Sequence, residues 1–346
     1  MRALFVDAFG APPVVRDVPE PSCPPDGMVI EVRATGLCRS DWHAWAGHDP
    51  DVALPHVPGH EFAGVVHEVG ADVTRVQIGD RVTVPFVCAC GRCATCRTGA
   101  PQVCEDQFQP GFTGWGSFAE RVAVPRADGN AVPLPEDVDF VSAAGLGCRF
   151  ATAYRAVAAH ARLAADEWLM VVGCGGIGLA ATMIASVRGA RVLAVDLSED
   201  SLAFARRFGA AATLVAGADL PAAAREVTDG GPHATLDAIG SAAVLRDCIE
   251  SLRPRGRHVQ VGLLVGPDAT PPVPMARMLA KELEIYGSHG MGAADYAALL
   301  AEIAAGRLDP GAMVTEQLPL TALAGAEGAL AGMGNRPATG TAVVVF

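Results

Sequence analysis

Hydrophobic and polar residues alternate in short runs along the first 150 residues of the chain. The runs MVIEVRATG, FAGVVHEVG and DRVTVPF are bounded by glycine, aspartate or proline. A period of two with such boundaries is typical of strands that bury one face. Residues 1–150 are therefore expected to be β-rich.

The pattern changes over residues 151–286, where apolar runs alternate with alanine-rich helical stretches. The expected strands include WLMVVG, RVLAVD, ATLDAIG and HVQVGLL, and the expected helices include LAATMIASVRGA and SLAFARRFGA. This alternation predicts a parallel sheet with helices on both faces. Residues 287–346 are mixed and end in the strand TAVVVF. We therefore expect an α/β domain inserted into a β-rich domain formed by 1–150 and 287–346.

Composition excludes several classes of protein. The 346 residues are 51% hydrophobic and 18% charged, with a net charge of -12. Binding to a nucleic-acid backbone needs a basic face, so no nucleic-acid partner is expected. The N-terminus does not resemble a signal peptide, and no run of about 18 apolar residues predicts a membrane span. We expect a cytoplasmic protein.

The stretch WLMVVGCGGIGLAATMIASVRGARVLAVD predicts a dinucleotide site. A strand leads into Gly173-x-Gly175-x-x-Gly178, a helix follows, and a second strand ends at Asp196. The glycines allow a tight turn, close approach of a pyrophosphate and close packing of the helix, whose N-terminus attracts phosphate. The expected cofactor-binding residues of the loop are Gly173, Gly175, Gly176, Ile177 and Gly178.

Asp196 indicates which dinucleotide binds. An acid at this position accepts hydrogen bonds from the ribose hydroxyls, and its charge repels a 2′-phosphate. No arginine follows in DLSEDS to reverse that preference. NAD is therefore expected over NADP, and Cys174 is interpreted as a small filler in the loop.

Half of the ten cysteines lie in CACGRCATCRTGAPQVC, residues 88–104. A disulfide knot is disfavoured in a reducing compartment, and a redox pair would need only two cysteines. Without Cys88 the spacing is regular, and one loop can wrap a tetrahedral zinc in a closed, structural site. The expected ligands are Cys90, Cys93, Cys96 and Cys104.

A second group of candidate residues is dispersed along the chain. GLCRSDWH contains Cys38, Ser40, Asp41 and His43; PGHEFAG contains His60 and Glu61; GLGCRFATAY contains Cys148. Each has an ordinary explanation, such as a buried thiol, a surface histidine or a helix-capping aspartate. Two thiolates and an imidazole are also the ligand set of an open zinc site. The sequence does not show whether the three meet.

These segments, in this order and over essentially the whole chain, resemble the zinc-dependent medium-chain alcohol dehydrogenases. The resemblance rests on Cys-x-Ser-x-x-His, Gly-His-Glu, the four-cysteine lobe, the Gly-Cys segment before Arg149 and the dinucleotide fingerprint. It implies a doubly wound Rossmann cofactor domain at 151–286, inserted into a GroES-like β-rich catalytic domain at 1–150 and 287–346. The zinc lobe would be at 88–104. An NAD-linked alcohol dehydrogenase with two Zn²⁺ per chain is implied.

The resemblance also implies roles for single residues. Ligands of the catalytic zinc would be Cys38, His60 and Cys148, and Glu61 would lie beside the metal and ligate it transiently. Asp41 would orient the zinc-bound histidine. The alcohol would lose its proton through Ser40 to His43 and its hydride to the nicotinamide.

Further residues match cofactor contacts of the family. Arg39 matches a pyrophosphate-binding arginine, and Thr152 matches a threonine near the nicotinamide. Thr341 stands where many members have a second pyrophosphate-binding arginine, and Arg336 is the candidate substitute. Arg149 replaces a small residue that is common in the family.

The substrate is the least determined feature. Phe86, Trp115 and Phe150 could form an apolar cleft, or could belong to an ordinary core. An apolar cleft favours primary or secondary alcohols, including aromatic ones, and their aldehydes or ketones. The alternatives are a polyol (sorbitol-like) or threonine-like zinc dehydrogenase and, more distantly, a zinc-ribbon binding module. A zinc-free quinone reductase would lack Cys38, His60 and the lobe. Family members form homo-oligomers, dimers or tetramers, and the chain length favours a tetramer.

Overall fold

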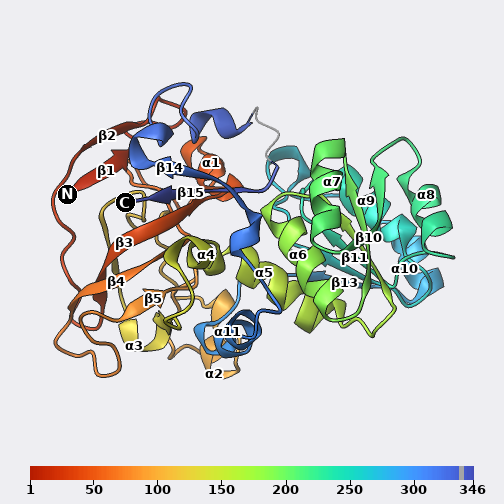
Figure 1. Ribbon diagram of the computed structural model, residues 1–346. Coiled ribbons are helices and arrows are strands. Elements are labelled where there is room, and N and C mark those ends of the chain that lie inside the picture. The colour runs from red at the N-terminus through yellow and green to blue at the C-terminus, as the bar shows by residue number, and fades with distance from the viewer. Residues whose placement is uncertain (335–338) are drawn as a thin grey trace. The chain divides into compact units, whose positions relative to one another are not determined.

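The structure, a computed structural model, describes residues 1–334 and 339–346 (Figure 1). Two compact units are formed. The first contains Met1–Ala151 and most of the described chain from Gly290 onward; the second contains Thr152–His289. The assignment of functional domains to 1–150, 151–286 and 287–346 stays a prediction.

The first unit is built on a mixed sheet of seven strands within the described residues. Its main path runs β14-β15-β3-β4-β5-β7, and β6 pairs with β3. The strands are β3 (Met28–Leu37), β4 (Phe62–Val69), β5 (Arg81–Thr83), β6 (Arg121–Val124), β7 (Val132–Pro133), β14 (Val314–Pro319) and β15 (Thr341–Val345). A separate hairpin pairs β1 (Arg2–Phe5) with β2 (Val14–Asp17).

The strand β3 is central to this unit because it pairs with three others. Its first half lies between β4 and β6, and its second half lies between β4 and β15. The core over β3 and β4 includes Met28, Ile30, Phe62 and Val66. The alternation seen in MVIEVRATG and FAGVVHEVG thus fits strands of a buried sheet.

Short helices connect the strands of the first unit. They are α1 (Arg39–Trp45), α2 (Ala94–Arg97), α3 (Ala127–Asn130), α4 (Phe140–Ala144) and α11 (Tyr296–Ala304). The helix α5 (Arg149–Arg155) begins in the first unit and ends in the second. None of the helices that the structure describes is long and apolar enough to cross a membrane.

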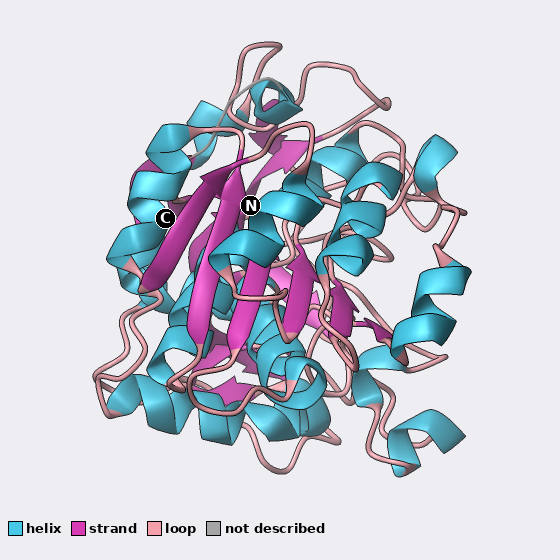
Figure 2. Ribbon diagram, turned by 90° about the vertical axis from the view of Figure 1, so that its right-hand side faces the viewer, coloured by secondary structure: helices cyan, strands magenta, loops and turns pink. Residues whose placement is uncertain are grey.

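The second unit is a parallel six-stranded sheet, in the order β10-β9-β8-β11-β12-β13 for the described residues. Figure 2 shows helices on both faces of this sheet. The strands are β8 (Trp168–Val172), β9 (Arg191–Asp196), β10 (Ala210–Val215), β11 (Ala234–Asp237), β12 (Arg257–Gln260) and β13 (Glu284–Gly287). The helices are α6 (Gly176–Val187), α7 (Glu199–Arg207), α8 (Leu220–Val227), α9 (Ala242–Ser251) and α10 (Met275–Lys281).

The order of the strands explains their composition. Every residue of β8 is buried, because this strand lies inside the sheet and both of its faces are covered. Its apolar run WLMVV is the pattern expected of such a strand. The expected parallel sheet with helices on both faces is confirmed, as is the β-rich unit.

Candidate active site and metal centres

Strand register brings Cys38 next to His60. Cys38 follows β3 directly, and His60 lies two residues before β4. The two strands are antiparallel, with Thr35 opposite Phe62. The end of β3 therefore meets the start of β4, and residues 22 positions apart become neighbours.

Cys148 reaches the same place from a 3₁₀ turn, Gly145–Gly147. The hydroxyl of the buried Tyr296, on α11, donates a hydrogen bond to the carbonyl of Leu146 at 2.9 Å. The backbone N–H of Arg149 donates to Oε1 of Glu61 at 2.7 Å. These bonds fix the chain on both sides of Cys148. No sequence pattern pointed to Tyr296.

Donor atoms of Cys38, His60, Glu61 and Cys148 all lie within 4.8 Å of one another. All four side chains are buried. The structure thus brings together the three residues expected to bind a catalytic zinc, with Glu61 beside them.

Asp41 fixes the orientation of His60. One carboxylate oxygen of Asp41 accepts a hydrogen bond from Nδ1 of His60 at 2.8 Å, and the other accepts one from the backbone N–H of Cys38 at 2.9 Å. Nε2 of His60 is buried and has no hydrogen-bond partner among the described residues. A buried polar atom without a partner is costly, and a metal ion would satisfy this one.

The ionisation of this cluster is strongly shifted. Contact with Cys148 lowers the pKa of the Cys38 thiol well below its usual value, although burial opposes this shift. The same contact, together with burial, raises the pKa of Cys148. Burial alone would lower the pKa of His60, but the charge of Asp41 and the hydrogen bond to it raise that pKa well above its usual value. These directions favour loss of the proton from Cys38 before Cys148.

Two sulfurs and one nitrogen are the donors of an open zinc site. The buried cluster of donor atoms and the unpartnered Nε2 of His60 fit zinc. Arg149 contacts both carboxylate oxygens of Glu61, the fourth member of the group, and transient ligation by Glu61 stays a prediction.

Ser40 and His43 lie one turn apart on α1, as residues three positions apart do on a helix. The Sγ of Cys38 contacts Oγ of Ser40 at 3.8 Å. Nδ1 of His43 lies 3.0 Å from Nδ1 of His48, a partner that the sequence did not indicate. Burial, followed by the charges of His48 and Arg39, lowers the pKa of His43. His43 is therefore disposed to be neutral and able to accept a proton.

Two phenylalanines pack against the candidate metal ligands. The ring centroids of Phe86 and Phe112 lie 6.2 and 5.0 Å from that of His60. Phe86 also forms an apolar cluster with Cys148. Phe112 was missed by sequence reasoning. Trp115 packs edge-on against Phe5, with centroids 5.6 Å apart, and its role at a substrate stays a prediction.

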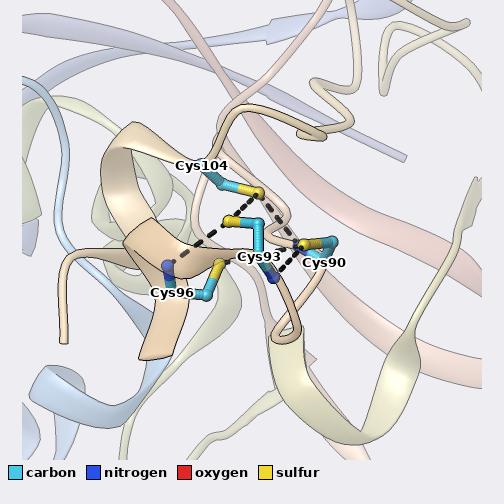
Figure 3. A group of neighbouring side chains, drawn as sticks. All are labelled: Cys90, Cys93, Cys96 and Cys104. Carbon is cyan, nitrogen blue, oxygen red and sulfur yellow. Dashed lines mark hydrogen bonds between the residues drawn. The ribbon is translucent and has the colours of Figure 1, made fainter. Parts of the chain in front are cut away.

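A second group of candidate metal ligands consists of four thiols (Figure 3). They belong to Cys90, Cys93, Cys96 and Cys104. Sγ of Cys90 lies 4.0 Å from that of Cys96, and Sγ of Cys93 lies 3.8 Å from that of Cys104. A tetrahedron with Zn–S bonds of about 2.3 Å has edges of about 3.8 Å, whereas a disulfide is about 2.05 Å long. The separations fit a zinc cage.

Backbone N–H groups surround these sulfurs. Cys90 accepts from the N–H groups of Arg92 and Cys93, at 3.4 and 3.3 Å, and Cys93 accepts from that of Cys96. The last of these bonds is the main reason why the pKa of Cys93 falls to about 6. These N–H groups thus favour thiolate, the form that binds metal, at Cys90 and Cys93. Burial instead raises the pKa of Cys96 to about 12 and raises that of Cys104. Cys88 lies outside the group; its thiol is buried, and burial raises its pKa to about 12.

The glycine loop of the second unit joins β8 to α6. Gly173 has a φ of +94°. A Cβ added at Gly178 would lie 1.8 Å from the carbonyl oxygen of Gly173, whereas one added at Gly175 would meet no atom within 4 Å. Gly178 is therefore needed for packing within the protein. The space at Gly175 has the shape expected where a ligand approaches the backbone.

Asp196, at the end of β9, lies beside this loop. Its carboxylate accepts hydrogen bonds from the N–H groups of Cys174, at 2.7 Å, and Ser198, at 2.9 Å. The acid is half-buried, so part of it remains accessible. Within the second unit the predicted loop and acid are thus adjacent, and they fit a dinucleotide.

The remaining cofactor candidates are less constrained. Arg39 is exposed, and its guanidinium lies 5.6 Å from the Trp42 ring. Thr152 is buried. The hydroxyl of Thr341 donates to the carbonyl of Met313 at 3.1 Å. Arg336 lies outside the described residues. Their contacts with a cofactor stay predictions.

Two family profiles match most of the chain. Residues 24–136 match the alcohol dehydrogenase GroES-like domain, and residues 176–305 match a zinc-binding dehydrogenase domain. The two matches cover the β-rich segment with the candidate metal ligands Cys38 and His60, and most of the parallel-sheet unit.

Similar proteins match this chain over most of its length. An alcohol dehydrogenase of Rhizobium meliloti is 36% identical over 293 residues, which are 83% of this chain and 84% of that protein. An L-threonine 3-dehydrogenase of Streptomyces avermitilis is 33% identical over 302 residues, 84% of each chain. The solved alcohol dehydrogenase of Thermus sp. ATN1 is 32% identical, with a TM-score of 0.90 over 100% of this chain and 99% of that one.

Proposed function

Since this chain belongs to the zinc-dependent medium-chain alcohol dehydrogenase family, we propose that it is an NAD-linked oxidoreductase for primary or secondary alcohols, aromatic ones included. The single observation that carries this proposal is the convergence of Cys38, His60 and Cys148. Their donor atoms are buried together, and Nε2 of His60 is left unpartnered among the described residues while Nδ1 is held by Asp41.

The roles of the residues follow from their contacts. Cys38, Cys148 and Nε2 of His60 would hold a zinc ion, and Asp41 would keep His60 in the tautomer that presents Nε2. When bound, zinc would lower the O–H pKa of the alcohol and NAD would supply the hydride acceptor.

The chain itself would move the proton. Ser40, in contact with Cys38, would pass it toward His43, which is neutral at the start because its pKa is lowered. His43 would then release the proton to solvent, and the products would be an aldehyde or ketone, NADH and H⁺. Phe86 and Phe112 would give the substrate an apolar wall.

We propose NAD rather than NADP as the cofactor because Asp196 lies beside the glycine loop. Its negative charge would repel a 2′-phosphate. The four-cysteine lobe would hold a second, structural zinc. Ten free thiols are best preserved in a reducing compartment such as the cytoplasm.

A homo-oligomer, either a dimer or a tetramer, is also proposed. The strand β13 is at the edge of the parallel sheet, where an unpaired edge can receive a strand of a second copy. Nearby, Met275 and Leu279 on α10 and Ile285 on β13 are exposed apolar side chains. Light scattering would measure the mass, and Leu279→Glu would reduce it if this face is the interface.

The test of the proposed function is a panel of alcohols offered to zinc-loaded protein with NAD and then with NADP. NADH formation with primary, secondary or benzylic alcohols would support the proposal. The panel includes L-threonine and polyols, because the Streptomyces avermitilis relative is a threonine dehydrogenase. Turnover of only these compounds would move the protein to that substrate class, and turnover with NADP alone would overturn the cofactor assignment.

Zinc analysis tests the site separately. Wild-type protein should hold about two zinc ions per chain, and Cys148→Ala should hold about one. Cys248→Ala is the matched control, since Cys248 is a buried thiol outside both metal groups. An unchanged zinc content in Cys148→Ala would remove this residue from the ligand set.

A further inference from the structure

Glu61 lies among the candidate ligands of the catalytic metal and yet is fully engaged elsewhere. One of its carboxylate oxygens is within 4.8 Å of the donor atoms of Cys38, His60 and Cys148. Arg149 contacts both oxygens: its backbone N–H donates to Oε1 at 2.7 Å, its Nε donates to Oε2 at 2.7 Å, and Nη2 lies 2.5 Å from Oε2.

The surroundings fix this pair in place. Glu61 is completely buried and Arg149 is 7% exposed. The backbone carbonyl of Glu61 accepts from the hydroxyl of Thr35, at 2.9 Å, and from the N–H of Gly36, at 2.7 Å. A Cβ on Gly36 would lie 2.5 Å from Oε2 of Glu61 and 2.6 Å from Nη2 of Arg149. Because Gly36 on β3 has no side chain, the Glu61–Arg149 pair fits against this strand, and a larger residue at that position would clash with it.

Formal charges explain why an arginine is needed here. Zinc with the two thiolates of Cys38 and Cys148 would be neutral, so the buried carboxylates of Asp41 and Glu61 would each add a negative charge. The carboxylate of Asp41 accepts a hydrogen bond from His60, and that of Glu61 pairs with a guanidinium. A buried charge is stable only when it is paired. The guanidinium supplies the balancing charge, and its fork holds a carboxylate at two points.

We propose that Arg149 is a positioning residue that keeps Glu61 out of the fourth coordination position of the catalytic metal. This inference rests on the proposed function and extends it. An open position is what separates a catalytic zinc site from a structural one. Without Arg149, the nearest free donor for the metal is the carboxylate of Glu61, and Cys38, His60, Cys148 and Glu61 would close the site.

The experiment uses the full chain with cobalt(II) in place of the catalytic zinc. Imidazole is the probe for the open position, and its binding is followed in the visible absorption of cobalt. The variants are Arg149→Met, Glu61→Gln and the double variant. Arg257→Met is the matched control, because Arg257 pairs with Glu167 at 3.1 Å, away from the metal ligands in sequence and in the other unit.

Arg149→Met is expected to change the cobalt spectrum in the absence of imidazole, to weaken imidazole binding by about tenfold or more and to slow loss of cobalt to a chelator. The double variant should restore imidazole binding, because the amide that Glu61→Gln introduces is a poorer ligand than the carboxylate. The Arg257→Met control should bind imidazole as the wild type does, whereas Glu61→Gln alone leaves the buried Arg149 without its counter-charge and should lower the melting temperature.

Unchanged imidazole binding and an unchanged spectrum in Arg149→Met would overturn the proposal, and so would failure of the double variant to recover. If Arg149→Met does not fold, Arg149→Lys decides by the same measurement, since lysine keeps the charge and loses the fork; it should weaken imidazole binding. Failure of the proposed function is seen separately, as a wild-type cobalt spectrum that Cys148→Ala leaves unaltered.

Discussion

Asp41 and His60 form a completely buried pair, in which Nδ1 of His60 donates to a carboxylate oxygen of Asp41 at 2.8 Å. Asp41 also accepts from the backbone N–H groups of Cys38 and Gly59. One carboxylate therefore ties together the segments that carry two candidate metal ligands. It does so by accepting hydrogen bonds from three donors.

Asp41→Asn is the first prediction that follows. The amide NH₂ of asparagine cannot accept, so at least one of the three hydrogen bonds is lost and the segments around His60 are held less firmly. Zinc affinity at the catalytic site should fall by about 10–100-fold, measured by competition with a chelator. Asp128→Asn is the control, because Asp128, on α3, accepts from the backbone N–H groups of Thr74 and Arg75 in an exposed loop. Equal zinc affinity in the two variants would contradict the role given to Asp41.

Cys93→Ser should disturb the four-cysteine lobe and leave the candidate catalytic site intact. We expect loss of about one zinc per chain, because a structural site needs all four thiolates. Cleavage by a protease within residues 90–104 should then become faster, since the metal orders this loop. Cys88→Ala, which removes a buried thiol outside the cage, should retain both zinc ions. A Cys93→Ser protein with full zinc content would exclude the cage.

Two glycines of the dinucleotide loop should respond in opposite ways to alanine. Gly175→Ala meets no atom of the protein, so its thermal stability should stay near that of the wild type while the Kd for NADH rises by about tenfold or more. Gly178→Ala drives a methyl group against the carbonyl of Gly173 and should lower the melting temperature as well. Thermal unfolding and NADH fluorescence separate the two effects. Undiminished NADH binding by Gly175→Ala would place the cofactor elsewhere.

The pH dependence of alcohol oxidation should report on His43. This residue can accept a proton only when neutral, and burial, then His48, lowers its pKa, so activity should persist below about pH 6.5. In His48→Gln the repelling charge is gone, the pKa of His43 rises, and the acid limb of the profile should move to higher pH. His67→Gln, at an exposed site, should leave the limb in place. A limb that His48→Gln does not move would indicate that another group titrates.

Features that depend on neighbours in sequence could be predicted from the sequence. The four thiols at 90–104 and the glycine loop at 173–178 are each contained in one short segment, so spacing alone limits their geometry. The strands β3, β4, β8 and β9 follow from apolar periodicity for the same reason. The fold class could therefore be predicted from these local patterns, whereas the preference for NAD and the number of zinc ions stay predictions.

The candidate catalytic cluster depends on tertiary structure. Cys38, His60 and Cys148 lie far apart in the chain, and their meeting depends on the register of β3 against β4 and on the turn that Tyr296 holds. Residue types alone could not show that Arg149 reaches across 88 positions to Glu61, or that His43 pairs with His48. Such contacts depend on side-chain direction and on the space left by neighbours such as Gly36. The sequence by itself determined which donor atoms were available. Packing determined which of them lie together, and it determined that the carboxylate of Glu61 pairs with Arg149.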